Sequence, residues 1–223
     1  MHRTRIKICG VTRVEDALAA ARLGADAIGM IFHEGSARNV SESIAHEIIR
    51  ALPPFVTPVG VFVDAPVARI GSLAVDLDFH VVQLNGGYDG GDLAALAGTT
   101  FRVIIAVRAQ ERTLAADVRG NSCSWVSGIV LETAATGVPG GSGVENDWDL
   151  VRRHQRLGTF DDAPPIIAAG GLTPENVGEV VRTIRPWAVD VSSGVEVSKG
   201  IKSPERIAEF IAAVRGAETA DRI

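Results

Sequence analysis

The chain has few cysteines, no cluster of basic residues and no long hydrophobic run. Only two of its 223 residues are cysteines, Cys9 and Cys123. A lone pair in a chain of this length is typical of free thiols in the cytosol rather than of a disulfide framework. The sequence also lacks the roughly 18 consecutive apolar residues of a membrane span and a secretory apolar core near its amino end. We therefore expect a cytoplasmic protein without a membrane partner.

Lysine and arginine residues are scattered along the chain, and its formal net charge is −5. Proteins that bind nucleic acids need a basic stripe or patch, so we expect no nucleic-acid partner. An anionic small ligand is compatible with this charge, because backbone N–H groups bind phosphate without a cationic patch.

What the chain does contain is a regular alternation of short apolar, β-branched runs with segments of helical period. The eight strand candidates are residues 5–9, 27–32, 58–63, 79–84, 101–107, 128–131, 165–169 and 187–192. Continuously apolar strands indicate a parallel sheet that is buried on both faces. Eight strand–helix repeats without a linker predict a single-domain (β/α)8 barrel, a TIM barrel, over residues 1–223.

The helical pattern is clear in some segments and weak in others. Six helix candidates cover residues 14–23, 41–51, 66–74, 147–157, 174–183 and 204–215, whereas the patterns after the fourth and fifth strands are weak. The structural alternative is a doubly wound open sheet, which is expected to carry G-x-G-x-x-G after its first strand. The segment that follows this first strand, CGVTR at 9–13, does not have that spacing.

Several helix ends carry recognisable caps. Thr12, Thr173 and Ser203 are candidate N-caps, and the latter two precede a proline at the expected first helical position. Gly24 is expected to end the first helix.

Cys9 ends the first strand, at the end of the barrel where enzymes of this fold keep their chemistry. A helix amino terminus that follows soon after favours the thiolate, and a free thiol with a pKa of ~8.5 needs only modest help to act as a base. The alternative is a small buried core residue, as most buried cysteines are.

Strand alternation places Lys7 on the same side as Cys9, while Ile6 and Ile8 face the helices. A lysine inside a barrel is costly unless it is paired. The first and last strands are neighbours in a closed barrel, so Asp190 is the expected partner of Lys7. Alternatively, Lys7 extends to the lower rim of the barrel and stays solvated.

Two glycine-rich turns follow the seventh and eighth strands, with Gly170 and Gly171 in the first and Ser193 and Gly194 in the second. Phosphate usually binds after these two strands in barrels of this kind, and glycine lets the backbone approach the oxygen atoms closely. The sequence therefore predicts a phosphorylated small molecule as ligand.

Three further features border the predicted mouth of the barrel. The loop 139–143, with Gly141 and Ser142, either closes over the ligand or is a surface loop. Glu132 ends the sixth strand and is a candidate general acid if burial raises its pKa; otherwise it is a surface acid. Arg38 either binds a carboxylate or phosphate or is solvated.

Taken together, these segments resemble the phosphoribosylanthranilate isomerase family over nearly the whole chain. The matching stretches are KICGVT at 7–12, ADAIG at 25–29, SARNVS at 36–41, VGVFV at 59–63, VQLNG at 82–86, GGSG at 140–143, AGGL at 169–172 and VDVSSGVE at 189–196. The resemblance implies a (β/α)8 barrel of tryptophan biosynthesis that needs no cofactor and no metal.

The resemblance further implies an Amadori rearrangement, an aldose–ketose isomerisation. N-(5-phosphoribosyl)anthranilate becomes 1-(2-carboxyphenylamino)-1-deoxyribulose 5-phosphate. Carried over to this chain, Cys9 is the base that removes the C2′ proton and Glu132 is the acid that protonates the ribose ring oxygen. Arg38 would contact the anthranilate carboxylate and Asp190 would support the site. The remaining substrate-binding positions are Asn85, Gly141, Ser142, Gly170, Gly171, Ser193 and Gly194.

The chain departs from the family pattern at three positions of the acid and aryl end. The family usually has Asp where this chain has Glu132, His where it has Asn85, and an aromatic residue where it has Asn39. Alternative functions are therefore a diverged paralogue acting on another phosphorylated N-glycoside, or a catalytically silent phosphosugar-binding protein. A histidine-pathway isomerase is disfavoured, since that relative has a carboxylate in place of Cys9. Both a monomer and a homodimer are compatible with this barrel.

Overall fold

Eight parallel strands close into a barrel in the computed structural model, which describes residues 3–132 and 148–220. The strands are β1 (Arg5–Ile8), β2 (Ala27–Phe32), β3 (Thr57–Val63), β4 (Val81–Asn85), β5 (Arg102–Arg108), β6 (Val126–Glu132), β7 (Ile166–Ala168) and β8 (Ala188–Val191). Each strand pairs with the next, and β1 pairs with β8 to close the ring. The predicted (β/α)8 barrel is confirmed, and every strand end lies within two residues of its predicted position.

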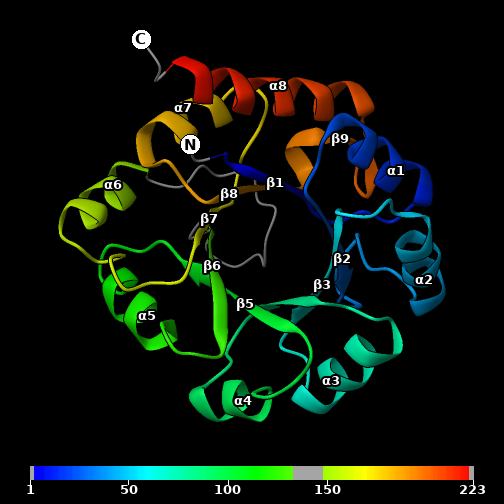
Figure 1. Cartoon of the computed structure of the whole chain (residues 1–223), viewed down its shortest axis with the longest axis horizontal. Helices are drawn as coiled ribbons and strands as arrows, with labels where there is room; N and C mark the ends of the chain where they lie inside the picture. Colours follow the sequence, from blue (N-terminus) through cyan, green and yellow to red (C-terminus); the bar gives the residue numbers. More distant parts are fainter. Residues whose placement is uncertain (1–2, 133–147, 221–223) are drawn as a thin grey trace.

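One helix follows each strand, and the helices form an outer ring around the barrel (Figure 1). They are α1 (Val14–Leu23), α2 (Glu42–Ala51), α3 (Val67–Asp76), α4 (Gly90–Ala95), α5 (Leu114–Asn121), α6 (Trp148–Arg156), α7 (Val177–Ile184) and α8 (Pro204–Ala220). Ile6 and Ile8 of β1 are fully buried in the apolar layer between sheet and helices, as strand alternation predicts. None of the helices within the described ranges is long and apolar enough to cross a membrane.

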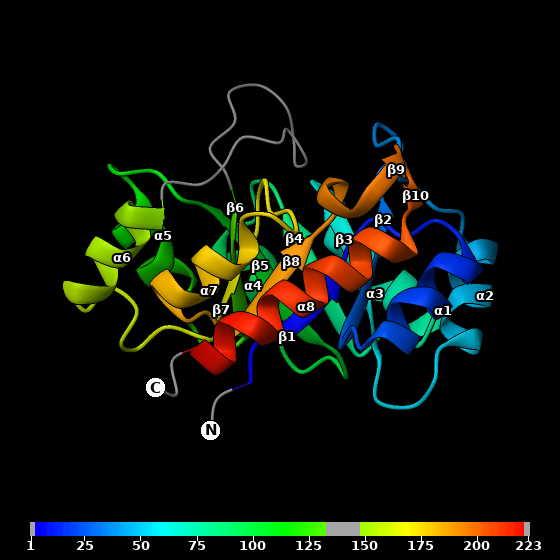
Figure 2. The same cartoon turned by 90° about the horizontal axis from the view of Figure 1, so that it is seen from above.

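The segment between β8 and α8 adds a short helix and a hairpin to the barrel. It consists of the 3-10 helix η1 (Ser193–Val195) and the antiparallel strands β9 (Glu196–Ser198) and β10 (Ile201–Lys202). Figure 2 shows this hairpin above the barrel, beside the segment that follows β2. The Thr12 hydroxyl donates to the Gly200 carbonyl over 2.6 Å, which ties the hairpin to the loop after β1.

Two of the predicted caps are confirmed. Gly24 ends α1 in the left-handed region, with a φ of 106°, and its N–H bonds to carbonyls of the last turn. The Ser203 hydroxyl accepts from the Arg206 N–H over 3.2 Å at the start of α8, which begins at Pro204 as predicted.

The other two predicted caps are wrong. Thr12 does not cap α1, since Arg13 occupies the cap position and the Thr12 hydroxyl donates to the Gly200 carbonyl. Thr173 accepts only from the Glu175 N–H, and α7 begins at Val177, three residues later than expected. In both places the hydroxyl group bonds within a loop at the mouth of the barrel and does not cap the helix.

Candidate active site

The carboxyl ends of the strands surround a cavity of about 950 Å³. Its lining includes most of the predicted site residues, namely Cys9, Arg38, Asn85, Glu132, Gly170, Gly171, Asp190 and Ser193. Gly194 lines a neighbouring cavity of about 320 Å³ that shares Gly171 and Ser193 with the first. Gly141 and Ser142 were also predicted, and they lie outside the described residues.

Lys7 and Asp190 form an ion pair at the centre of this arrangement. Their side chains face each other across the seam between β1 and β8, with Nζ 2.8 Å from Oδ2, and are only 5% and 8% exposed. Burial alone would lower the pKa of Lys7, but the combined attraction and hydrogen bonding of Asp190 and Cys9 raise that pKa. The predicted pairing is confirmed, and the alternative of a solvated lysine at the lower rim is wrong.

Cys9 packs among Val59 and Val61 inside the barrel and also lines the cavity. Burial raises the pKa of its thiol, while the nearby Lys7 ammonium acts in the opposite direction. Burial therefore opposes the thiolate that a following helix terminus is expected to favour, and Lys7 is the described group that counteracts burial most. Gly29 of β2 leaves the room for this sulfur, since a Cβ there would lie 2.8 Å from Sγ.

Glu132 enters the cavity from the end of β6. Burial raises the pKa of its carboxyl group, and the hydrogen bond from Asn85 counteracts part of that rise. The Asn85 Nδ2 group donates to Glu132 Oε1 over 2.8 Å. A carboxyl group with a raised pKa retains its proton closer to neutrality, which is the property a general acid requires.

Gln83 is a site residue that sequence reasoning missed. It lines the cavity two positions before Asn85 on β4, is 2% exposed, and its Nε2 donates to Asn85 Oδ1 over 3.0 Å. The available signal was a polar residue in an otherwise apolar strand, on the same face as Asn85.

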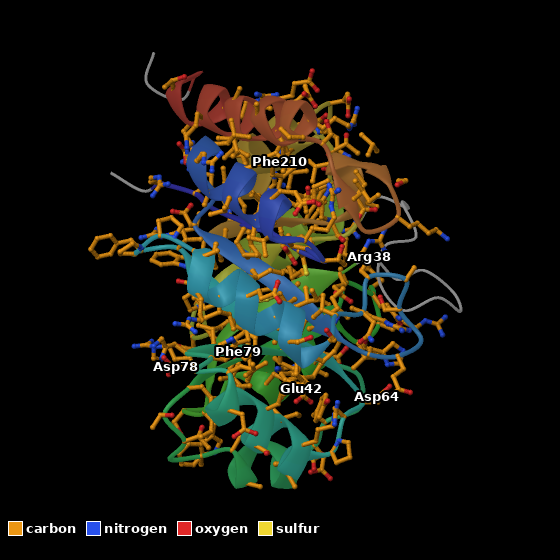
Figure 3. The ribbon with its side chains drawn as sticks, turned by 90° about the vertical axis from the view of Figure 1, so that its right-hand side faces the viewer. Arg38, Glu42, Asp64, Asp78, Phe79 and Phe210 are labelled. Carbon is orange, nitrogen blue, oxygen red and sulfur yellow. The ribbon has the colours of Figure 1, made fainter. Side chains whose placement is uncertain are left out.

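Arg38 reaches the cavity from the loop after β2, beside the hairpin of β9 and β10 (Figure 3). Its Nε and Nη2 bond to the two carboxylate oxygens of Glu196 over 2.7 and 2.8 Å. Lys202, which is fully buried, donates to the same carboxylate over 2.8 Å and to the Ser192 carbonyl over 3.0 Å. The side chains of Arg38, Glu196 and Lys202 together carry a net charge of +1, which favours an anionic ligand beside them.

Asn39 does not take part in this lining, although its position was expected at the aryl end. Its Oδ1 accepts from the His33 N–H over 2.9 Å. The side chain therefore stabilises its own loop, and the described cavity lining does not include it.

The two glycine-rich turns meet at the rim of the cavity. Gly170 and Gly171 have φ values of 88° and 65°, a region that other residues rarely adopt. A Cβ at Gly194 would collide with the carbonyl oxygen of Leu172, so this turn is pressed against the one after β7. Arg206 of α8 connects them further, because its Nε donates to the Gly194 carbonyl over 2.9 Å and its Nη2 donates to Glu175, which follows the first turn, over 3.2 Å.

Residues 3–132 and 148–220 contain no candidate metal site. Within them, no group of three or more histidine, cysteine and acidic side chains is placed to hold a metal ion.

Comparison with known proteins gives a consistent result. Residues 6–213 match the family model described as N-(5'phosphoribosyl)anthranilate (PRA) isomerase. The N-(5'-phosphoribosyl)anthranilate isomerase of Pseudomonas aeruginosa (strain LESB58) is 45% identical over 217 residues, which cover 96% of this chain and 97% of that protein.

Two solved structures show the same similarity in three dimensions. A phosphoribosyl anthranilate isomerase in complex with reduced 1-(o-carboxyphenylamino)-1-deoxyribulose 5-phosphate superposes with a TM-score of 0.82 at 36% identity, covering 96% of this chain and 99% of that one. Monomers derived from the dimeric enzyme of Thermotoga maritima superpose with a TM-score of 0.81 at 34% identity, with the same coverage.

Proposed function

The chain belongs to the N-(5'-phosphoribosyl)anthranilate isomerase family, and we propose that Cys9 is the general base and Glu132 the general acid of its reaction. It is an isomerase of tryptophan biosynthesis that converts N-(5-phosphoribosyl)anthranilate to 1-(2-carboxyphenylamino)-1-deoxyribulose 5-phosphate. The alternative functions considered above, a paralogue with another substrate and a silent binding protein, are set aside by this full-length similarity.

The proposed steps use one proton donor and one proton acceptor. Glu132 gives its proton to the ribose ring oxygen while the bond between that oxygen and C1′ breaks, which leaves a Schiff base between C1′ and the anthranilate nitrogen. The Cys9 thiolate then removes the C2′ proton, and the electrons of that C–H bond form the enolamine. Tautomerisation of the enolamine gives the ketone product.

One observation carries these assignments. Cys9 and Glu132 line the same cavity, and the pKa of each is influenced by both members of the Lys7–Asp190 pair. The thiol and the carboxyl group therefore share one cavity and one buried ion pair, which supports a donor and an acceptor that act on the same sugar. Their pKa values are raised by the same cause, burial.

The ends of the substrate have separate proposed sites. The phosphate binds to the turns with Gly170, Gly171, Ser193 and Gly194, where positive φ values and the close approach of two backbones favour N–H contacts. The anthranilate carboxylate binds to Arg38, whose Nε and Nη2 are held by Glu196. That arrangement leaves the remaining edge of the guanidinium for a ligand.

Cys9→Ala and Glu132→Gln test the two roles. Each should abolish turnover, followed as the loss of substrate fluorescence, while inorganic phosphate still raises the melting temperature. Cys123→Ala is the matched control, since this second free cysteine is not part of the described cavity lining. Turnover that survives Cys9→Ala would remove the base assignment.

The assembly and the compartment are proposed on separate grounds. We propose a cytoplasmic homodimer, since a related enzyme of 34% identity is dimeric and both cysteines are free. The contact surface includes Phe55, which precedes β3 at the amino end of the barrel and is fully exposed. A large apolar side chain in that state is a candidate for an interface.

A further inference from the structure

Three side chains at the mouth of the barrel form a hydrogen-bonded row that runs in one direction. Gln83 Nε2 donates to Asn85 Oδ1 over 3.0 Å, and Asn85 Nδ2 donates to Glu132 Oε1 over 2.8 Å. Gln83 and Asn85 occupy alternate positions of β4, so both face the interior, and Glu132 ends β6 two strands away. We refer to Gln83 and Asn85 as the amide relay.

The direction of the relay decides which oxygen of Glu132 can carry a proton. An amide N–H group only donates, so Glu132 Oε1 must accept from Asn85. Since the carbonyl oxygen of a carboxylic acid accepts better than its hydroxyl oxygen, this bond favours a proton on Oε2. We propose that Gln83, acting through Asn85, keeps the transferable proton of Glu132 on Oε2, where it is available to the ring oxygen of the substrate. This inference rests on the proposed role of Glu132 as the general acid.

The opposite direction is chemically possible and unproductive. Glu132 would then donate its own proton to Asn85 Oδ1, and Asn85 Nδ2 would donate to Gln83 Oε1. The proton would be held by the relay instead of facing the cavity. Gln83 therefore acts as a positioning residue, since the donor that it offers to Asn85 selects the productive direction.

An unsatisfied atom at the start of the relay indicates how the substrate takes part. Gln83 Oε1 is buried and has no hydrogen-bond partner among the described residues, and a buried acceptor without a donor is costly. Because Gln83 lines the cavity, a hydroxyl group of the sugar is a suitable donor. A sugar hydroxyl that donates to this oxygen would hold the amide in the orientation that the relay needs.

Besides its burial, several neighbouring groups influence the pKa of Glu132. Asp190 of β8 raises the pKa of Glu132, whereas Lys7 of β1 and Arg108 of β5 lower it, as does the hydrogen bond from Asn85. Loss of the relay is therefore expected to move the titration of Glu132 to higher pH, while the three charged groups stay in place.

Gln83→Glu is the sharpest test, because it keeps the size of the side chain and replaces the donor by a second acceptor. The introduced carboxylate would attract Asn85 Nδ2 and reverse the relay. We expect kcat to fall about tenfold or more, the effect of ~1.4 kcal/mol in the transition state. Gln155→Glu is the matched control, since Gln155 Nε2 donates to the Ile184 carbonyl over 2.8 Å between α6 and α7.

Two substitutions at Asn85 separate polarity from packing. Asn85→His keeps an acceptor and a donor in the same order when the imidazole is neutral, so it should retain about tenfold more kcat than a variant that offers neither group, the effect of ~1.4 kcal/mol. Asn85→Leu offers neither group and should lose kcat as Gln83→Glu does. The infrared band of the protonated carboxyl, identified by its absence in Glu132→Gln, should titrate at higher pH in Asn85→Leu.

The outcomes test separately the role of the amide relay and the role of Glu132 as the general acid. Turnover in Glu132→Gln would remove the general acid, and the relay with it. An inactive Glu132→Gln together with wild-type kcat in Gln83→Glu, and with wild-type kcat and carboxyl titration in Asn85→Leu, would overturn the relay alone. If Gln83→Glu does not fold, the comparison of Asn85→His with Asn85→Leu decides, and equal losses in both would also overturn the relay.

Discussion

At the residue scale, the buried carboxyl group of Glu132 links catalysis to stability. Burial raises its pKa in the folded chain, whereas in the unfolded chain the group titrates near the usual glutamate value of about 4.3. A group with a raised folded pKa contributes stability below its unfolded pKa, and that contribution is lost as the pH rises through the folded pKa. Above the unfolded pKa, burial of this carboxyl group therefore lowers the stability of the fold.

Glu132→Gln should for this reason be more stable than wild type at neutral pH. The difference should shrink as the pH falls and vanish below about pH 4, where the carboxyl group is protonated in both states. Urea unfolding at a series of pH values measures it. A wild-type chain that gains stability relative to Glu132→Gln as the pH rises would contradict the raised pKa.

The Lys7–Asp190 pair gives a second prediction at this scale. Asp190→Asn leaves the Lys7 ammonium buried without its counter-charge, and breaking such a pair costs about 3–5 kcal/mol. Replacing both residues, with Lys7→Met and Asp190→Leu, removes the uncompensated charge and should cost less than Asp190→Asn alone. Chemical unfolding of wild type, Asp190→Asn and the double variant provides the comparison, and a double variant less stable than Asp190→Asn would argue against it.

At the scale of elements, the turn after β8 has to lie against the turn after β7. A Cβ at Gly194 collides with a backbone oxygen that cannot swing aside. Gly194→Ala should therefore raise KM for the phosphorylated substrate about tenfold, equivalent to ~1.4 kcal/mol, and reduce the thermal stabilisation by inorganic phosphate. Gly216→Ala in α8 is the control, because nothing lies within 4 Å of its Cβ position. It should stabilise the chain by about 0.5–1 kcal/mol.

The elements that sequence reasoning found are those with a strong periodic signal. The strands are continuous apolar runs, and the position of Asp190 opposite Lys7 follows from alternation in two strands that must be neighbours. The helices α4 and α5 have six and eight residues, too few for a clear pattern. Glu196 and Lys202 were missed because they lie in an irregular hairpin, where no period indicates which side chains face inward.

Gln83 was missed for another reason. Its strand was predicted, but a single glutamine in an apolar run gives no sign of its partner. The relay depends on the separation between β4 and β6, which is a property of the closed barrel and not of either segment. The Thr12 and Thr173 caps failed similarly, since tertiary contacts at the mouth compete for hydroxyl groups that would otherwise cap a helix.

At the scale of the whole molecule, the two ends of the barrel carry different surfaces, a cavity at one end and an exposed aromatic side chain at the other. The carboxyl ends of the strands hold the cavity, whereas the amino end carries the exposed Phe55. Phe55 adopts a φ of 71°, which is uncommon for a bulky residue, and still projects into solvent. A partner that covers this side chain would explain why it is retained there.

Phe55→Ser is expected to weaken the proposed homodimer without changing turnover. Loss of a buried aromatic anchor costs about 2 kcal/mol, equivalent to a roughly 30-fold higher dissociation constant. Sedimentation equilibrium of the purified protein measures it, and kcat serves as the check on the intact cavity. Val197→Ser is the control, since Val197 is also exposed but lies in β9, beyond the carboxyl ends of the strands. A wild-type chain that sediments as a monomer at all concentrations would rule out the homodimer.

The closure between β1 and β8 has a consequence for protein synthesis. Lys7 lies in β1, which leaves the ribosome before β8, and its counter-charge Asp190 lies 183 residues further along the chain. A nascent polypeptide that has not yet released β8 thus has neither a sealed cylinder nor a counter-charge for its lysine. Isomerase activity on stalled ribosomes should therefore appear only after β8, together with the turn and hairpin that follow it, has cleared the exit tunnel.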